Sequence, residues 1–444
     1  MIQRARLKHR PATRLSSRGV LSLGLAALAC IASSDTLNAE WSTYQANAAH
    51  TGYVSTSLDF SQAAAPRWST PLDLYPTIPG GLAVGANTVL VTGYDALTTY
   101  GLYALNAYSG AIVWDHTNLD RINPPAYANG KAYVVTVRQD TGPHLGGHLR
   151  AYDIQTGAAI FDTPISQSLR FLSPTPFGDD LYLGQAGGAA PGVYSYDGAT
   201  GQLNWSATGL FDNGWTPAVD SQYVYSYTAL NNQSPIRGLF LMVDRATGQP
   251  SYAALDSFDY GSFVTNQAVV LGPNHDAFMT DLNGHLIARD VLLDATHTPH
   301  IEWSKSGYGG QPVLADGVLY VTTTDGVVHA LDELTGDFLW SWQAPGGHFA
   351  FVKIATDNAL VVTVKDKFSL NPIATYALDP ATHAPIWSYP LGGELALSDG
   401  ILYVLNGGVT AFTVPEPRSL ALAMLGGVVT LLACRRRRAR RPLL

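Results

Sequence analysis

The stretch Ala330-Leu-Asp-Glu-Leu-Thr-Gly-Asp-Phe-Leu-Trp340 decides the fold, because weaker copies of it recur along most of the chain. A complete copy has Asp or Asn first, Gly four residues later and an aromatic residue four residues after that. The complete copies are Asn106/Gly110/Trp114, Asp153/Gly157/Phe161, Asp197/Gly201/Trp205, Asp244/Gly248/Tyr252 and Asp332/Gly336/Trp340. Two further copies lack the glycine, namely Asp379/His383/Trp387 and the looser, one-residue-longer Asp294/His297/Trp303. A unit that recurs every 38 to 50 residues predicts a ring of repeated sheets.

The spacing within one copy predicts a tight turn between two strands. The Asp carboxylate can accept hydrogen bonds from backbone N–H groups two or three residues further on, and Gly adopts the left-handed conformation that other residues avoid. The aromatic residue then lies on the next strand, where it packs between neighbouring sheets. Upstream, Asp325-Gly326 separates Val318–Thr324 from Val327–Leu331, which predicts a second hairpin. Each unit therefore supplies four antiparallel strands, which is one propeller blade.

The two ends of the repeat region determine the expected number of blades. Trp68 has no Asp-Thr-Gly before it, while the last strands, around Ile401–Leu405 and Val409–Thr413, have no Trp after them. The simplest arrangement lets the N-terminal strand at Trp68 complete the last blade, which closes the ring and removes free sheet edges. The expected fold is an all-β, eight-bladed β-propeller over residues 66–413, after a lead-in over residues 40–65. A seven-bladed ring is the alternative if the unit from Asp290 to Trp303 is not a blade.

The unit Ala-Leu-Asp-x-x-Thr-Gly-x-x-x-Trp resembles the repeat of the PQQ-like, or quinoprotein-dehydrogenase-like, eight-bladed propellers. The resemblance covers roughly residues 66 to 413. It implies a fold rather than a reaction, because the family contains quinone-cofactor dehydrogenases and also cofactor-free members such as the outer-membrane assembly lipoprotein.

Cysteine usage bears on the choice between these members. The dehydrogenases of the family have an adjacent Cys pair against the cofactor ring and a calcium site built from Glu, Asn and Asp. The two cysteines of this chain, Cys30 and Cys434, lie far apart near its ends, and no matching acidic trio can be placed. We therefore expect no PQQ, no calcium, no other metal and no catalytic residues, with a quinone-dependent dehydrogenase as the competing hypothesis.

The N-terminal 39 residues have the order of a secretory signal peptide. Six basic residues precede the apolar run Val20–Ala32, and Leu37-Asn-Ala39 follows as a cleavage site for signal peptidase. Lipid attachment at Cys30 is the alternative, although Ala27-Leu-Ala29 is a poor match to the residues that normally precede a lipidated cysteine.

The C-terminal segment, residues 414–441, combines a short motif, an apolar run and an arginine cluster. Val414, Pro415, Glu416 and Pro417 are followed by the mostly apolar run Ser419–Cys434, predicted to be a transmembrane helix, and then by Arg435, Arg436, Arg437 and Arg438. The cluster is expected to keep the tail cytoplasmic and the propeller outside. The pattern resembles the PEP-CTERM sorting signal of Gram-negative bacteria, which implies recognition by an exosortase. A simple stop-transfer anchor is the alternative, but it does not explain Pro-Glu-Pro.

The charge of the exported body differs from that of the whole chain. Thirteen of the 26 basic residues, but only one of the 34 acidic residues, lie in the two end segments, so residues 40–417 carry a net charge near −20. This charge argues against binding to nucleic acid or anionic lipid. We therefore expect membrane contact only through the C-terminal helix before processing.

Long hairpins between the second and third strands of several units are the expected partner-binding loops. They carry scarce positive groups on an acidic body, namely Arg138, Arg237, Lys365 and Lys367. Ordinary loop variation explains the same lengths. The pairs His144/His148 and His297/His300 have spacings that suit a metal ion, but neither has an evident third ligand in the sequence.

These observations predict an exported, non-catalytic propeller that acts as an interaction or scaffold module. The resemblance of the tail implies a place in the outer membrane, at the cell surface or in the extracellular matrix, with an unidentified envelope or matrix partner. The alternatives are a PQQ-dependent dehydrogenase and an outer-membrane assembly propeller lipoprotein.

Overall fold

The computed structural model describes residues 40–76, 81–95, 99–137, 146–165, 173–185, 192–208, 216–230, 235–259 and 267–417. These residues form strands and two 3-10 turns, η1 (Phe60–Gln62) and η2 (Pro345–Gly347), with no α-helix among them. Within this part of the chain, no helix has the length and apolarity needed to cross a membrane. The predicted signal peptide, the predicted helix Ser419–Cys434 and both cysteines lie outside the described residues.

Most strands form small antiparallel sheets that follow one another along the chain. The first such sheet contains β7 (Arg121–Ile122), β8 (Ala126–Ala128), β9 (Lys131–Val137), β10 (Gly147–Asp153) and β11 (Ala159–Ile165). The next contains β12 (Thr175–Phe177), β13 (Asp180–Gln185), β14 (Gly192–Asp197) and β15 (Leu203–Thr208). It is followed by the sheet of β16 (Ala218–Val219), β17 (Tyr223–Leu230), β18 (Arg237–Asp244) and β19 (Pro250–Asp259).

Three more sheets continue this series. One contains β20 (Val270–Leu271), β21 (Asp276–Thr280), β22 (His285–Asp290) and β23 (His300–Ser306), so the irregular unit with Asp294 does lie in a four-stranded sheet. Another contains β24 (Tyr308–Ala315), β25 (Val318–Thr323), β26 (Val328–Asp332) and β27 (Phe338–Trp342). The third contains β28 (Phe349–Thr356), β29 (Leu360–Lys365), β30 (Pro372–Leu378) and β31 (Pro385–Tyr389), with β1 (Tyr53–Val54) parallel to β28.

The eight-stranded sheet joins the two ends of the propeller. It contains β3 (Leu82–Gly85), β4 (Thr88–Tyr94), β5 (Tyr100–Asn106), β6 (Ile112–Leu119), β32 (Glu394–Ser398), β33 (Ile401–Leu405), β34 (Gly407–Thr413) and β2 (Trp68–Pro76). One end of β2 pairs with β34, with Trp68 opposite Ala411, and its other end pairs with β4. The strand at Trp68 therefore completes the last unit, as the sequence predicted.

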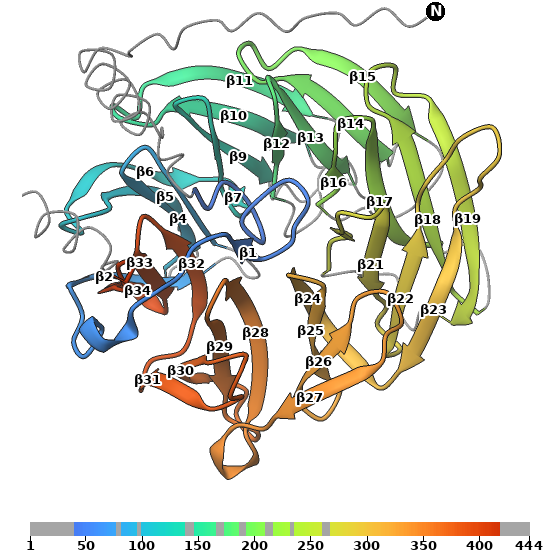
Figure 1. Cartoon of the computed structure of the whole chain (residues 1–444). Helices are drawn as coiled ribbons and strands as arrows, with labels where there is room; N and C mark the ends of the chain where they lie inside the picture. Colours follow the sequence, from blue (N-terminus) through green and yellow to red (C-terminus); the bar gives the residue numbers. More distant parts are fainter. Residues whose placement is uncertain are drawn as a thin grey trace, which may run out of the picture. The chain divides into compact units, whose positions relative to one another are not determined.

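The sheets are arranged around a common centre, with the first strand of each sheet innermost (Figure 1). Their faces are apolar, so each sheet buries a layer of side chains against its neighbour, for example Val134 and Leu90 between the sheets of β9 and β4. The molecule is a β-propeller.

The repeat motif forms the turn between the last two strands of a unit. Asp153 Oδ1 accepts hydrogen bonds from the Gln155 and Thr156 N–H groups at 3.1 and 2.8 Å, and Gly157 has φ +71°. The hydrogen bond that Asp153 accepts from the Thr156 hydroxyl contributes most to lowering the pKa of the Asp153 carboxyl, followed by the hydrogen bond from the Thr156 N–H group. The same turn recurs at Asp197, Asp244 and Asp332. The motif residues are therefore parts of a turn.

The aromatic residue of each copy joins its sheet to the next sheet. Two of these contacts involve packing of the ring itself. The Phe161 ring packs on Gly201, and the rings of Trp340 and His383 stack with centroids 4.6 Å apart. The others are hydrogen bonds to carbonyl oxygens: Trp68 to Ala107 (3.0 Å), Trp114 to Ile154 (2.9 Å), Trp205 to Arg245 (2.9 Å), Tyr252 to Pro299 (2.7 Å), Trp303 to Glu333 (3.3 Å) and Trp387 to Ala63 (2.8 Å). The last contact leads from the final copy back to the segment before β2.

The N-terminal lead-in passes the innermost strands in chain order. The hydrogen bonds are Trp41 with Val84, Ser42 with Tyr127, Thr43 with Pro174, Ala48 with Val219, Ala49 with Leu271, Thr51 with Leu314 and Gly52 with Ala355. His50 is fully buried between the carbonyl oxygens of Tyr44 and Pro217, at 2.7 and 3.0 Å. Residues 41–54 therefore form a plug at the turn-bearing end of these strands, which the sequence had left without a role.

We predict that Gly157→Ala destabilises the fold by about 2–4 kcal/mol, because the new methyl group adds left-handed strain and meets the Trp114 ring at 2.8 Å. Gly130→Ala is the matched control. Gly130 also has positive φ, +73°, but has no atom within 4 Å of the new Cβ, so we expect a loss of only about 1 kcal/mol. Urea unfolding of both variants measures the difference, and equal losses would show that the aromatic contact contributes nothing.

Candidate functional site

The structure brings together only two of the four predicted partner-binding residues. Lys365 and Lys367 lie on the hairpin between β29 and β30. Arg237 lies in a different sheet, at the start of β18 and opposite Leu230 and Asp259. Arg138 is outside the described residues. The candidate site is therefore the segment of residues 365–373, called here the Phe368 hairpin.

The Phe368 hairpin has the same turn as the repeat motif. Asp366 Oδ1 accepts hydrogen bonds from the Phe368 and Ser369 N–H groups at 3.0 and 2.8 Å, and Leu370 N–H donates to the Asp366 carbonyl. These hydrogen bonds lower the pKa of the Asp366 carboxyl. The tip is thus held by its own backbone and does not depend on a partner for its shape.

Two large apolar side chains at the tip of this hairpin face solvent. Phe368 is 85% exposed and Leu370 is 56% exposed. Leu370 occupies the position that Gly holds in the complete repeats, with φ +58°, so the chain keeps a leucine where glycine would be unstrained. A strained, exposed apolar residue on a rigid turn is a feature that the fold itself does not require.

Basic groups lie against the aromatic rings of this region. Lys367 Nζ lies 5.2 Å from the Phe368 ring centroid and donates to the Gly346 carbonyl at 3.1 Å. Lys365 Nζ lies 5.1 Å from the Phe351 ring centroid, and burial, followed by the charge of Lys353, lowers its pKa. The hairpin therefore presents an aromatic tip with positive charge beside it, which is typical of protein interfaces.

The predicted sorting motif begins inside the folded body. Val414 is fully buried and its N–H donates to the Gly400 carbonyl at 2.7 Å, and the Pro415 carbonyl accepts from Asp59 N–H at 2.8 Å. Glu416 Oε1 accepts from the Thr56 hydroxyl at 3.2 Å. The cluster Arg435–Arg438 lies outside the described residues.

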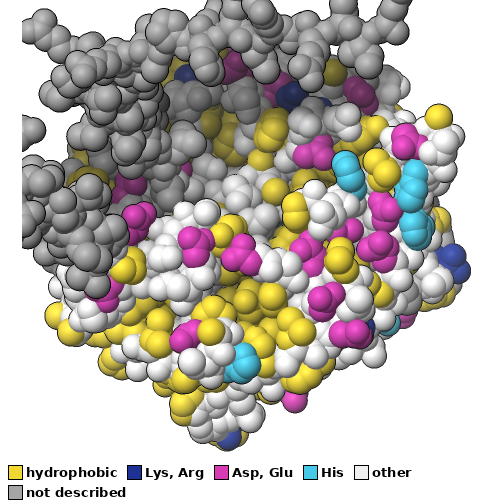
Figure 2. Space-filling view, viewed as in Figure 1, with side chains coloured by type: hydrophobic (Ala, Val, Ile, Leu, Met, Phe, Trp, Pro, Cys, Tyr) yellow, Lys and Arg dark blue, Asp and Glu magenta, His cyan; other side chains and the backbone are white. Residues whose placement is uncertain are grey.

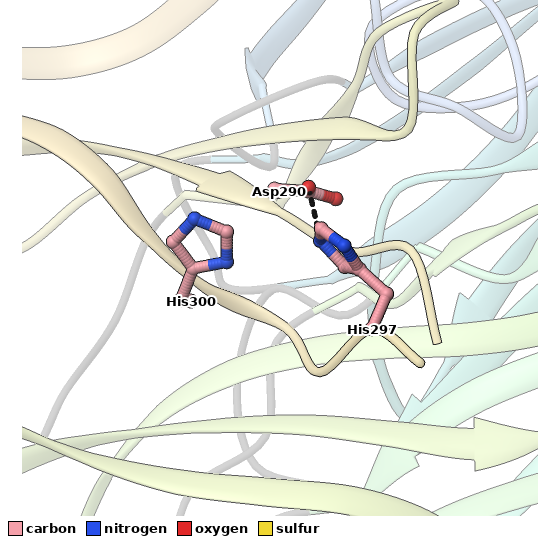
Figure 3. A group of neighbouring side chains, drawn as sticks. All are labelled: Asp290, His297 and His300. Carbon is pink, nitrogen blue, oxygen red and sulfur yellow. Dashed lines mark hydrogen bonds and ion pairs between the residues drawn. The ribbon is translucent and has the colours of Figure 1, made fainter. Parts of the chain in front are cut away.

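A second group of chemical interest lies between β22 and β23. One ligand atom each from Asp290, His297 and His300 lies within 4.8 Å of the other two, and Figure 3 shows the three side chains converging. His297 Nε2 and Asp290 Oδ2 are 2.5 Å apart. The sequence suggested the histidine pair but gave no third ligand, because Asp290 lies ten residues before His300 on the preceding strand.

The remaining atoms of this cluster are held by backbone groups. Asp290 Oδ1 accepts from Leu292 N–H at 2.8 Å, and His300 Nδ1 lies 3.3 Å from the Thr298 carbonyl. Each of the three side chains offers one ligand atom, and a metal ion would replace the direct contact between Asp290 Oδ2 and His297 Nε2. Two imidazoles and one carboxylate suit zinc, with a fourth position open to water.

Charge is unevenly distributed over the face shown in Figure 2. Acidic side chains are spread over this face, whereas basic side chains are few. The lysines of the Phe368 hairpin are thus basic groups on a body whose expected net charge is near −20.

The four-stranded units and their turn motif define the protein as a propeller of PQQ-like repeats. Residues 55–296 and 291–394 match the model of the family described as outer membrane protein assembly factor BamB. The chain belongs to this family. No curated protein sequence matches it.

Solved structures share the fold at low sequence identity. BamB from Moraxella catarrhalis is 16% identical with a TM-score of 0.57, covering 78% of this chain and 100% of that one. A europium-containing methanol dehydrogenase is 15% identical with a TM-score of 0.60, covering 83% and 90%. The quinohemoprotein alcohol dehydrogenase from Comamonas testosteroni is 13% identical with a TM-score of 0.61, covering 86% and 81%. An outer membrane protein assembly factor and dehydrogenases thus share this architecture.

We predict that the cluster of Asp290, His297 and His300 binds one zinc ion per chain. His297→Ala and His300→Ala should each weaken zinc binding by about tenfold or more, because each removes one of three protein ligands. His148→Ala is the control, since among the described residues His148 pairs with Asp162 alone and Arg150 shares that carboxylate. Calorimetric titration with zinc measures the affinity. Equal binding by all three variants would contradict the assignment.

Proposed function

We propose that the protein is an exported, non-catalytic propeller that acts as a protein-interaction or scaffold module in the cell envelope, at the cell surface or in the extracellular matrix. The observation that carries this proposal is the Phe368 hairpin. Its aromatic tip is fixed by an Asp366 turn and exposed to solvent, which is the arrangement of a binding anchor.

The hairpin combines three properties that favour binding over accidental exposure. An aromatic side chain buries a large area at a modest loss of conformational entropy. The turn is already formed, so little order is lost on association. Leu370 keeps its strained position beside Phe368, where a glycine would be favoured by stability alone. The partner is an envelope or matrix protein with an apolar pocket and acidic groups around it.

Eight blades are part of this proposal. The four-stranded runs β3–β6 and β32–β34 with β2 add two units to the six separate sheets, and the unit with Asp294 has its own sheet. The aromatic contacts between successive sheets begin with Trp68 and Ala107 and end with Trp387 and Ala63. They support the same number of blades.

Export and sorting complete the proposal. Signal peptidase removes residues 1–39, and an exosortase recognises the Val414–Pro417 motif and the tail beyond it. Mass spectrometry of the mature protein tests both steps: the expected mature chain begins at Glu40 and lacks Arg435–Arg438. An intact arginine cluster would instead indicate a permanent anchor, and lipid on Cys30 would indicate a lipoprotein.

Family membership favours one alternative function, participation in outer-membrane protein assembly. The shared fold also keeps a quinone-dependent dehydrogenase as a competing hypothesis. Adding quinone and calcium to the purified body separates the enzyme from the binding module, because a bound chromophore with dye reduction would establish catalysis. Outer-membrane assembly defects in a deletion strain would favour the assembly role.

We predict that Phe368→Ser abolishes partner capture while the free energy of unfolding changes by less than about 0.5 kcal/mol, because the ring is solvent-exposed. The measurement is photocrosslinking from residue 371, beside the tip, in cells that express the full chain. Phe338→Ser, at an exposed aromatic on β27 that is 58% accessible, is the matched control and should leave the crosslinks unchanged. Identical crosslinks from all three proteins would remove the hairpin from the proposal.

Leu370→Gly should stabilise the protein by about 1 kcal/mol, since glycine adopts φ +58° without strain. The same substitution should weaken partner capture, because it removes an apolar side chain beside Phe368. Urea unfolding and crosslinking measure the two effects. Greater stability with unchanged partner capture would show that Leu370 does not contribute to partner binding.

A further inference from the structure

A pocket of about 500 Å³ opens at the plug-bearing end of the propeller, next to the sheets of β20 and β24. Residues Ala49, Thr51 and Tyr53 of the plug form one wall. Leu271, Pro273, Leu314 and Ala315 contribute apolar surface. The size is within the usual range of small-ligand sites. Neither Lys365 nor Lys367 lines this pocket, so its occupancy is independent of the Phe368 hairpin.

The charged groups of the pocket are carboxylates. Asp220 is engaged by the fold, because it accepts from the Gln222 and Tyr223 N–H groups and from the Tyr225 hydroxyl, each at 2.7 Å. Asp316 is exposed at the turn after β24. Glu333 is different: it is only 3% exposed, and its Oε1 has no hydrogen-bond partner among the described residues.

The side chain of Glu333 is not needed for the turn that carries it. The Glu333 N–H donates to the Gly317 carbonyl at 3.0 Å, and the Glu333 carbonyl accepts from the Trp303 indole. The backbone of Glu333 alone therefore holds the turn and binds the aromatic residue of the neighbouring sheet. The other copies have at this position Ala107, Ile154, Gly198, Arg245, Ala295 and Pro380. A buried carboxylate without a partner costs free energy, so its presence here indicates a ligand.

The surrounding chain leaves room for this carboxylate. A Cβ at Gly272 would lie 2.7 Å from Glu333 Oε1, although Gly272 has no positive φ that would require glycine. Asp276, 4% exposed, has its Cβ 3.2 Å from the same position, and its Oδ2 also has no hydrogen-bond partner among the described residues. Burial, followed by the neighbouring charges of Glu302, Glu333 and Asp290, raises the pKa of Asp276 to about 7. Among the described residues that line the pocket, none is Lys or Arg.

A metal ion is not the ligand that this geometry favours. Among the described residues, three potential metal ligands converge only at Asp290, His297 and His300, whereas the pocket contributes one buried carboxylate. One buried carboxylate together with apolar lining suits a single organic cation on an aliphatic stem.

We propose that this pocket binds an alkylammonium group, whose charge pairs with Glu333 and whose methylene stem lies against Leu271, Pro273 and Leu314. A free diamine and a lysine side chain of another protein share this chemistry. The site differs from the Phe368 hairpin in its residues and in its ligand, so either proposal can fail without the other.

Titration of the full exported body at neutral pH and low salt tests the proposal, with 1,5-diaminopentane and N-acetyl-lysine methylamide as probes. At least one probe should bind saturably, while 1-pentanol should not. Binding of the diamine alone would identify a free amine as the ligand, and binding of the lysine derivative alone would identify a side chain. Glu333→Gln should weaken binding by about tenfold or more, because it removes the charge but keeps the shape.

Glu302→Gln is the control, since it removes one exposed negative charge near Asp276 outside the pocket. It should change the affinity less than about twofold. Glu333→Gln is expected to unfold at a temperature no lower than the parent protein, so lost binding would not reflect lost folding. Failure of both probes to bind, equal affinity of Glu333→Gln, or calcium binding that depends on Glu333 would each overturn the proposal.

Discussion

The contact between an aromatic side chain and the turn of the next sheet is the interaction on which the whole molecule depends. A four-stranded sheet of this size buries too little apolar surface to be stable alone, so each unit needs neighbours on both sides. The indole of Trp114, for example, packs on Gly157 and donates to the Ile154 carbonyl, so one side chain sets both the spacing and the rotation of two sheets. Glycine is required at Gly157 because a Cβ there would meet the Trp114 ring, whereas the copy at Asp379 has His383 at this position and stacks its ring on Trp340.

A ring of such contacts must also be closed, and the N-terminal segment closes it in two ways. β2 completes the sheet of β34, while Trp387 donates to the Ala63 carbonyl just before that strand. The plug then adds hydrogen bonds to the innermost strands of the successive sheets, from Val84 to Ala355. Closure therefore depends on residues before the first complete repeat, and loss of the plug would expose inner-strand backbone groups at the centre of the ring.

The sequence predicts those parts of this structure whose contacts are local. Asp153, Thr156 and Gly157 meet within five residues, so their spacing was sufficient to predict the turn, and the Asp325-Gly326 hairpin appears between β25 and β26 as expected. The plug was not predictable, because Thr43 and Ala48 meet partners more than 100 residues away that share no pattern with them. The third potential metal ligand was missed although it is local, because Asp290 meets the histidines only through the pairing of β22 with β23, which the residue spacing does not show.

The same reasoning explains where function is to be sought in a repeat protein. Residues that every copy shares are explained by turns and packing, so they carry no information about a ligand. The informative positions are those where one turn has an unfavourable contribution to folding free energy that comparable turns of the chain do not have. Leu370 is strained at the point where the same type of turn in the complete repeats has glycine, and the Glu333 side chain has an oxygen without a partner among the described residues where other copies have Ala or Ile. Neither cost improves the fold, and the two positions lie in different structural settings, a protruding hairpin and a recessed pocket. A propeller that keeps both is therefore better explained by two separate binding events than by one extended site.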